Sequence, residues 1–186
     1  MAYRLELRQH FTVMVNRWDL TRVAPTQAQL GFIEQKRMTL RERVTCWDQA
    51  RANVLFTVQA EKIVELAGKY VVADGAGQQL ARIEKDFKGS LAQSTYRVLT
   101  GAGTYTVRER GRVRAILRRL WGLVVDWPWL LPIQFEVLRD GGADAGSIQR
   151  QWSRLRDVYD IDIHDDGLDE RVAAAMAVAV DAFMNR

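Results

Sequence analysis

The sequence predicts a mainly β fold, an antiparallel barrel of about 12 strands closed around an apolar C-terminal helix. Three observations favour it. Short β-rich strings recur about every 25 residues, a turn sequence follows each second string, and no residue from Val172 to Val180 is polar. A steady period indicates one supersecondary unit used several times. A chain of 186 residues suits one domain, spanning residues 1–186, of this class.

The first strings of the repeat align on Ile33, Val58, Ile83 and Val107, which are 25, 25 and 24 residues apart. Polar and apolar side chains alternate within them, as expected of strands with one buried face. The strings are Gly31–Lys36, Leu55–Lys62, Leu80–Lys85 and Thr104–Arg110.

Each unit holds a second string that is short, β-branched and aromatic, and a turn sequence follows it. The second strings are Arg43–Trp47, Lys69–Ala73 and Thr95–Leu99, and the turns begin at Asp48, Asp74 and Thr100. Glycines in the last two turns supply the positive φ that tight turns need. The unit is therefore predicted to be a β-hairpin, and the Gly-x-Gly sequences are hairpin turns, since neither continues as a phosphate-binding loop.

Further strands are expected before and after the repeats. They are Tyr3–Leu7, Phe11–Val15, Ile133–Val137, Ser147–Trp152 and Val158–Ile163. About a dozen strands result, and closure into a barrel would leave no exposed sheet edge.

The last segment, Leu168–Met184, is predicted to be a helix. It opens with acidic residues, which favour a helix N-terminus, and its interior is rich in Ala. A helix that is apolar on all sides is buried. At about 1.5 Å per residue it would extend roughly 25 Å, comparable with the height of a barrel.

The sequence, with its series of β-hairpins, an Asp-rich closing strand and an apolar C-terminal helix, resembles the LURP-one-related family. That family shares the tubby-like barrel with phospholipid scramblases. The residues that carry the resemblance are Phe32–Lys36, Phe56–Lys62, Leu80–Phe87, Asp157–Ile163 and Leu168–Met184. The resemblance implies a 12-stranded barrel with the helix through its centre, and a protein that is not an enzyme. Tubby domains bind phosphoinositides and scramblases act on phospholipids, but no motif here carries lipid-binding residues over.

This sequence departs from the family pattern in an insertion between hairpin repeats, residues 111–132, which is also the candidate lipid or partner surface. Its side chains combine a basic cluster with three tryptophans: Arg112, Arg114, Arg118, Arg119, Trp121, Trp127 and Trp129. Basic residues attract anionic headgroups, and Trp prefers the membrane interface. The alternative is that the segment packs on its own barrel or on a partner protein. Nucleic-acid binding by the same residues is disfavoured, because no nucleic-acid motif accompanies them.

Catalytic and metal chemistry have few candidate residues. The two histidines form no ligand pair, no serine lies in a nucleophile elbow, and Cys46 lies mid-strand. We therefore predict no enzymatic activity and no cofactor. Four carboxylates form a candidate calcium site, Asp160, Asp162, Asp165 and Asp166. The structural alternative is that the first two face outward from a strand, and that Asp166, together with Asp169, lies where a helix N-terminus favours negative charge.

Composition predicts a cytoplasmic protein that could lie at a membrane surface. A single cysteine is typical of a reducing compartment, and the N-terminal residues show no export signal. The longest apolar stretch, Leu120–Ile133, is too short and too interrupted to span a bilayer. The net charge of +4 suits an anionic partner, although 23 acidic residues offset 27 basic ones. The expected partners are a phospholipid surface or another protein; a ligand-binding barrel would need a hollow interior.

Overall fold

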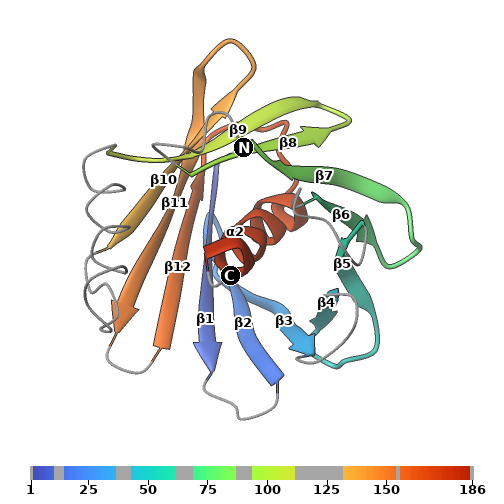
Figure 1. Cartoon of the computed structure of the whole chain (residues 1–186). Helices are drawn as coiled ribbons and strands as arrows, with labels where there is room; N and C mark the ends of the chain where they lie inside the picture. The colour runs from blue at the N-terminus through green and yellow to red at the C-terminus, as the bar shows by residue number, and fades with distance from the viewer. Residues whose placement is uncertain are drawn as a thin grey trace, which may run out of the picture.

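The protein is an antiparallel β-barrel with one helix inside it (Figure 1). The computed structural model describes residues 2–10, 15–36, 43–61, 69–86, 94–111, 132–153 and 156–184. Within these ranges twelve strands pair in sequence order, and β12 pairs with β1 to close the sheet. This confirms the predicted fold class.

The strand bounds follow the hairpin pattern. The strands are β1 (Tyr3–His10), β2 (Val15–Ala24), β3 (Ala28–Lys36), β4 (Arg43–Asp48), β5 (Val54–Ala60), β6 (Lys69–Asp74), β7 (Gln79–Lys85), β8 (Thr95–Thr100), β9 (Gly103–Glu109), β10 (Ile133–Arg139), β11 (Ala143–Ser153) and β12 (Arg156–Ile163). The helix is α2 (Glu170–Met184).

The 25-residue repeat has a physical origin in the turns that follow β4, β6 and β8. Asp48 and Asp74 each accept backbone N–H groups from the turn, on Ala52 and Ala76 among others. Thr100 caps the turn after β8 in the same way, because its hydroxyl accepts the Ala102 N–H. Short polar side chains at the first turn position satisfy turn donors that no strand can pair. The repeated unit is therefore a strand, a side-chain-capped turn and a returning strand.

The expected second strand, Phe11–Val15, coincides with the described residues only at Val15, and the structure contains a strand from there on that the sequence analysis did not predict. Strand β2 begins at Val15 and runs to Ala24, while residues 11–14 lie outside the described ranges. Trp18 and Leu20 point inward and are 1% and 3% exposed. Beyond them, a bulge where β2 meets β3 shifts the register after Leu20. Because the bulge interrupts the alternation of buried and exposed side chains, the period-two pattern that predicts a strand is not visible in this part of the sequence.

The first and last strands form the seam of the barrel. Six residue pairs join β1 to β12, from Tyr3 opposite Ile163 to Arg8 opposite Val158.

Gly146 of β11 lies where this strand comes close to β12. Its φ is +148°, and a Cβ there would lie 2.2 Å from the Asp162 carbonyl oxygen. Only glycine fits this close approach of β11 to β12.

Helix α2 forms the centre of one continuous hydrophobic core. Every residue from Val172 to Val180 is at most 4% exposed, so the apolar run predicted from the sequence is enclosed. The helix begins at Glu170 rather than Leu168, because Asp169 caps it: its carboxylate accepts the Arg171 N–H at 2.8 Å. In the described residues no helix combines the length and the apolar character needed to cross a bilayer.

Candidate functional site

The inside of the barrel is occupied by protein. Side chains of α2 pack against inward-facing residues of β1, β5, β6, β7 and β12. The large inward side chains include Trp18, Tyr96, Phe56 and Phe135, each less than 2% exposed. Among described residues, a hollow of about 220 Å³ lies instead on the outer wall, beside Thr57, Gln59 and Val71.

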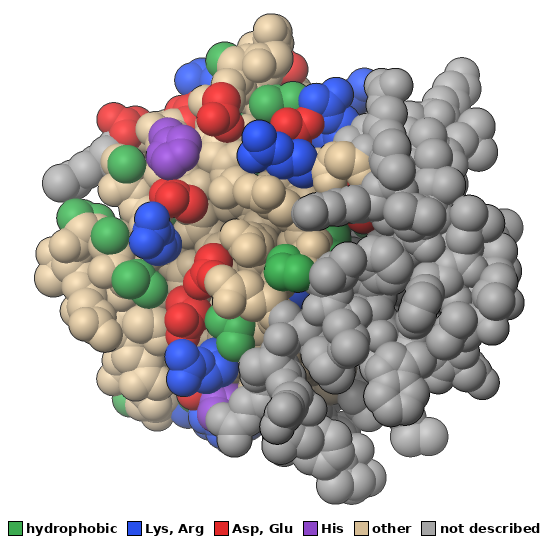
Figure 2. Space-filling model, turned by 90° about the vertical axis from the view of Figure 1, so that its left-hand side faces the viewer, with side chains coloured by type: hydrophobic (Ala, Val, Ile, Leu, Met, Phe, Trp, Pro, Cys, Tyr) green, Lys and Arg blue, Asp and Glu red, His purple; other side chains and the backbone are tan. Residues whose placement is uncertain are grey.

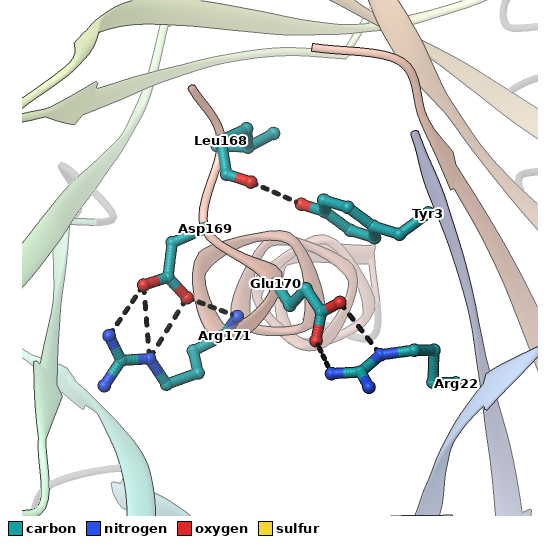
Figure 3. Close-up of polar contacts among 6 residues, drawn as sticks. All are labelled: Tyr3, Arg22, Leu168, Asp169, Glu170 and Arg171. Carbon is teal, nitrogen blue, oxygen red and sulfur yellow. Dashed lines mark hydrogen bonds and ion pairs between the residues drawn. The ribbon is translucent and has the colours of Figure 1, made fainter. Parts of the chain in front are cut away.

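The N-terminal end of α2 is tied to the first two strands (Figure 3). Arg22 of β2 donates two hydrogen bonds to the Glu170 carboxylate, at 2.9 and 2.5 Å. The Tyr3 hydroxyl of β1 donates to the Leu168 carbonyl at 2.7 Å. Burial raises the pKa of Tyr3, so the phenol remains a neutral donor. A bidentate arginine and a buried hydroxyl together fix the position of the helix start.

The loop from β12 to α2 is held to the neighbouring strands. Asp165 accepts a hydrogen bond from Arg139 Nη1 of β10 at 3.2 Å and from the Gly167 N–H at 2.8 Å. Tyr105 of β9 donates to the same carboxylate at 3.4 Å. The carboxylate thus joins β9 and β10 to the loop across this end of the barrel.

A second polar cluster lies farther along the helix, at the inner face of β11 and β12. The Tyr159 hydroxyl donates to Asp181 of α2, and Arg150 Nη2 donates to Asp157 at 2.7 Å. Asp181 is 5% exposed. Burial, and next the charge of Asp181, raise the pKa of Tyr159. Because the helix is apolar on all sides, these hydrogen bonds, with those of Glu170, select one rotation of the helix in the barrel.

Sequence reasoning missed this cluster, although a signal was present. Asp181 follows directly on an all-apolar run that was predicted to be buried. A buried carboxylate needs a donor, and the inward-facing Tyr159 of the closing strand is a suitable one.

The outer face of the seam carries alternating charges (Figure 2). Arg4 of β1 pairs with Asp162 of β12 at 3.1 Å, and Arg8 pairs with Glu6 at 3.0 Å. Glu6 also lies directly opposite Asp160 in the pairing of β1 with β12, which brings two negative charges close together across the strands. Partial burial and, next, the Glu6 charge raise the pKa of Asp160, while a hydrogen bond from a β11 glutamine opposes them. The wall is mixed in sign rather than a patch of one charge.

The four carboxylates of the candidate calcium site have separate surroundings. Asp160 and Asp162 lie on the outer face of β12, while Asp165 and Asp166 lie in the loop before α2. Asp165 is already engaged with Arg139 and the loop backbone. Within the described ranges, no three His, Cys, Asp or Glu residues are grouped so as to hold a metal ion. The structure therefore adds no support to the calcium hypothesis.

The candidate lipid surface falls outside the described residues. This concerns all seven of its side chains: Arg112, Arg114, Arg118, Arg119, Trp121, Trp127 and Trp129. Of the insertion itself, only residues 111 and 132 are described, at the end of β9 and the start of β10. The membrane, partner and own-barrel interpretations of this segment thus stay open predictions.

Cys46, the single cysteine, points into the core from β4 and is 0% exposed. Burial raises the pKa of its thiol to about 12. Since the thiolate is the reactive form, this environment suppresses nucleophilic chemistry at Cys46.

Comparison with models of known protein families gives a match. A family model described as LURP-one-related matches residues 30–181, from within β3 to within α2. Among curated proteins no match to the chain was found.

Proposed function

The chain belongs to the LURP-one-related family, and from that premise we propose that it is a non-enzymatic barrel protein that binds anionic phospholipid at a membrane surface. The observation that carries the proposal is the helix inside the barrel. A barrel that binds a small molecule holds it in its interior or mouth. Here that space is taken by α2, with Val172–Val180 at most 4% exposed. Binding therefore falls to the outer surface.

The chemistry of the partner follows from charge. The chain carries a net charge of +4, and the sequence of the insertion contains four arginines and three tryptophans within residues 112–129. Lys and Arg near an anionic bilayer each contribute about 1 kcal/mol of attraction, and Trp partitions into the headgroup zone. An anionic phospholipid surface meets both requirements.

Co-sedimentation with vesicles tests the proposal. The purified protein is spun with neutral phosphatidylcholine vesicles and with vesicles that contain 30–40% phosphatidylserine, a composition chosen to give a strongly negative surface, at low and physiological salt. We expect binding to the anionic vesicles alone and weaker binding at higher salt. The variant with Arg114, Arg118 and Arg119 changed to Glu should stay in the supernatant.

A matched pair of single variants controls for the general loss of positive charge. Arg118→Glu changes the candidate surface, and Arg97→Glu changes an exposed arginine in the middle of β8 by the same amount. Arg118→Glu should reduce binding more than Arg97→Glu. Equal effects would contradict the assignment to the insertion, and no sedimentation of wild type at low salt would refute the lipid proposal in favour of a protein-binding or structural module.

A further inference from the structure

Two atoms of the polar cluster on the inner face of β11 and β12 lack hydrogen-bond partners. Arg150 Nε and Asp157 Oδ1 are buried, and neither has a partner among the described residues. The bond between Arg150 Nη2 and Asp157 Oδ2, at 2.7 Å, uses another nitrogen and the other oxygen of the same two groups. In folded proteins the large majority of buried polar atoms are paired, either with protein or with ordered water. These two atoms therefore call for a partner.

A similar atom on the outer wall is explained by the protein itself. Arg82 Nε is also buried without a geometrically good hydrogen bond, but it lies 2.9 Å from a Glu84 oxygen. That ion pair accounts for its burial. The inner cluster is different, because the ion pair of Arg150 with Asp157 leaves one donor and one acceptor over.

The side chains around the inner ion pair are apolar or already engaged. In the strand pairing Arg150 lies between Ile133 of β10 and Tyr159 of β12. The preceding inward residue of β11 is Ile148, which is 0% exposed. The Tyr159 hydroxyl donates its proton to Asp181. In this part of the described barrel the neighbouring side chains thus leave Nε–H without an acceptor and Oδ1 without a donor.

The two atoms define the chemistry of a molecule that would fit between them. Nε–H only donates a hydrogen bond, and a carboxylate oxygen only accepts one. A halide ion accepts but cannot donate, and a cation cannot accept, so neither kind of ion satisfies both atoms. A water molecule donates and accepts. Because Nε and Nη2 share one carbon, and Oδ1 and Oδ2 another, the two atoms flank the same ion pair. Two hydrogen bonds of about 2.8 Å let one water join atoms up to about 5.6 Å apart.

We propose that an ordered water molecule inside the barrel bridges Arg150 Nε and Asp157 Oδ1. It accepts a hydrogen bond from Nε–H and donates one to Oδ1, which satisfies both buried atoms. Solvent can reach the site, since the two side chains keep 18% and 12% of their surface exposed. The ion pair belongs to the same cluster as the Tyr159–Asp181 contact. The water is therefore part of the polar seat that fixes α2 in the barrel.

A crystal structure at a resolution that shows ordered waters tests the site directly. We expect density for a water within about 2.7–3.2 Å of both Arg150 Nε and Asp157 Oδ1. A protein atom bonded to either of them, an absence of density between two ordered side chains, or a different arrangement of the ion pair would each overturn the proposal.

Crystals soaked in bromide and in rubidium test the chemistry of the bound molecule. Both ions scatter anomalously, and we expect no anomalous peak between Arg150 and Asp157 from either of them. A bromide peak would identify an anion site, and a rubidium peak a cation site. Either result would overturn the assignment to water.

Nuclear magnetic resonance tests the same site in solution. The Nε–H proton of Arg150 should show a rotating-frame cross-peak to water with a sign opposite to the diagonal, which is the signature of a long-lived bound water. The control is Arg97, an exposed arginine in the middle of β8, where proton exchange should give a peak of the same sign as the diagonal. An exchange peak at Arg150 like that at Arg97, or no cross-peak to water there, would refute the bridge.

A matched pair of variants assigns the two signals and removes one partner of the water. Arg150→Lys and Arg97→Lys each keep the positive charge and each remove one Nε–H group. In the crystal structure of Arg150→Lys the bridging density should be lost, whereas Arg97→Lys should keep it. A water in an unchanged position in Arg150→Lys would show that Nε does not hold it. The measurements on the wild-type protein remain decisive if Arg150→Lys fails to fold.

Discussion

Replacement of a small helix residue tests whether the barrel interior is filled. Ala175 lies at the middle of α2 and is 0% exposed. Ala175→Leu adds three carbon atoms. In a filled core such overpacking costs about 1–3 kcal/mol. In a hollow interior the same atoms would leave water and stabilise the fold by about 0.8 kcal/mol each, or about 2.4 kcal/mol. The two interpretations therefore differ in sign and by roughly 3–5 kcal/mol.

Thermal and urea unfolding followed by circular dichroism measure this difference. For a domain of this size 1 kcal/mol corresponds to about 2–4 °C in Tm. We expect Ala175→Leu to lower Tm by about 2–12 °C. Met176→Leu, at a neighbouring position that is 1% exposed, keeps the volume and should cost less than about 1.5 kcal/mol. A higher Tm for Ala175→Leu than for wild type would refute the filled interior and reopen ligand binding inside the barrel.

Three further outcomes follow from individual contacts. The raised pKa of Asp160 means that its charge opposes folding at neutral pH, so its contribution to stability improves as pH falls through the folded pKa, and the effect is complete below about 3.9. Asp160→Asn should therefore raise the urea midpoint at pH 7 by the equivalent of about 0.2–1 kcal/mol but leave it unchanged at pH 3.5. Parallel pH profiles of the variant and wild type would contradict a role for Glu6. Tyr159→Phe removes a hydrogen-bond donor from buried Asp181 and should lower the free energy of unfolding by about 1–3 kcal/mol. In a double-mutant cycle with Asp181→Leu, the two losses of stability should be clearly less than additive, and additive losses would mean that the hydrogen bond contributes nothing. Cys46, with a pKa of about 12, should react with a disulfide reagent at pH 8 only after urea unfolding, and rapid reaction of the native protein would disprove its burial.

The hairpins could be predicted from sequence because their information is local. Asp48, Asp74 and Thr100 recur every 26 residues at the first turn position, and the flanking strands alternate around them. The enclosed helix could also be predicted from the sequence, since a helix with no polar face is not stable at the protein surface. Both features appear within a short window of the chain.

What could not be predicted depends on contacts between distant residues. The strand from Val15 to Ala24 contains a bulge whose position is set by its pairing with β3. A short stretch of sequence does not contain that information. At Asp181 the sequence signals a buried carboxylate that needs a donor, but its pairing with Tyr159 depends on the depth and rotation of α2, which are set only when the barrel closes. The opposition of Glu6 and Asp160 follows from the β1–β12 register and joins residues 154 positions apart.

The β1–β12 seam also constrains how the molecule is made. During synthesis β1 leaves the ribosome before the other eleven strands and β12 after them, so the nascent sheet keeps two unpaired edges until its last strand has emerged. Helix α2 follows later still, and the inward faces of all twelve strands lack their central packing partner until then. Unpaired edges and uncovered apolar faces are what chaperones recognise and what aggregation exploits. We therefore expect the fold to be completed in a single late step, after α2 has emerged, that joins the seam and encloses the helix.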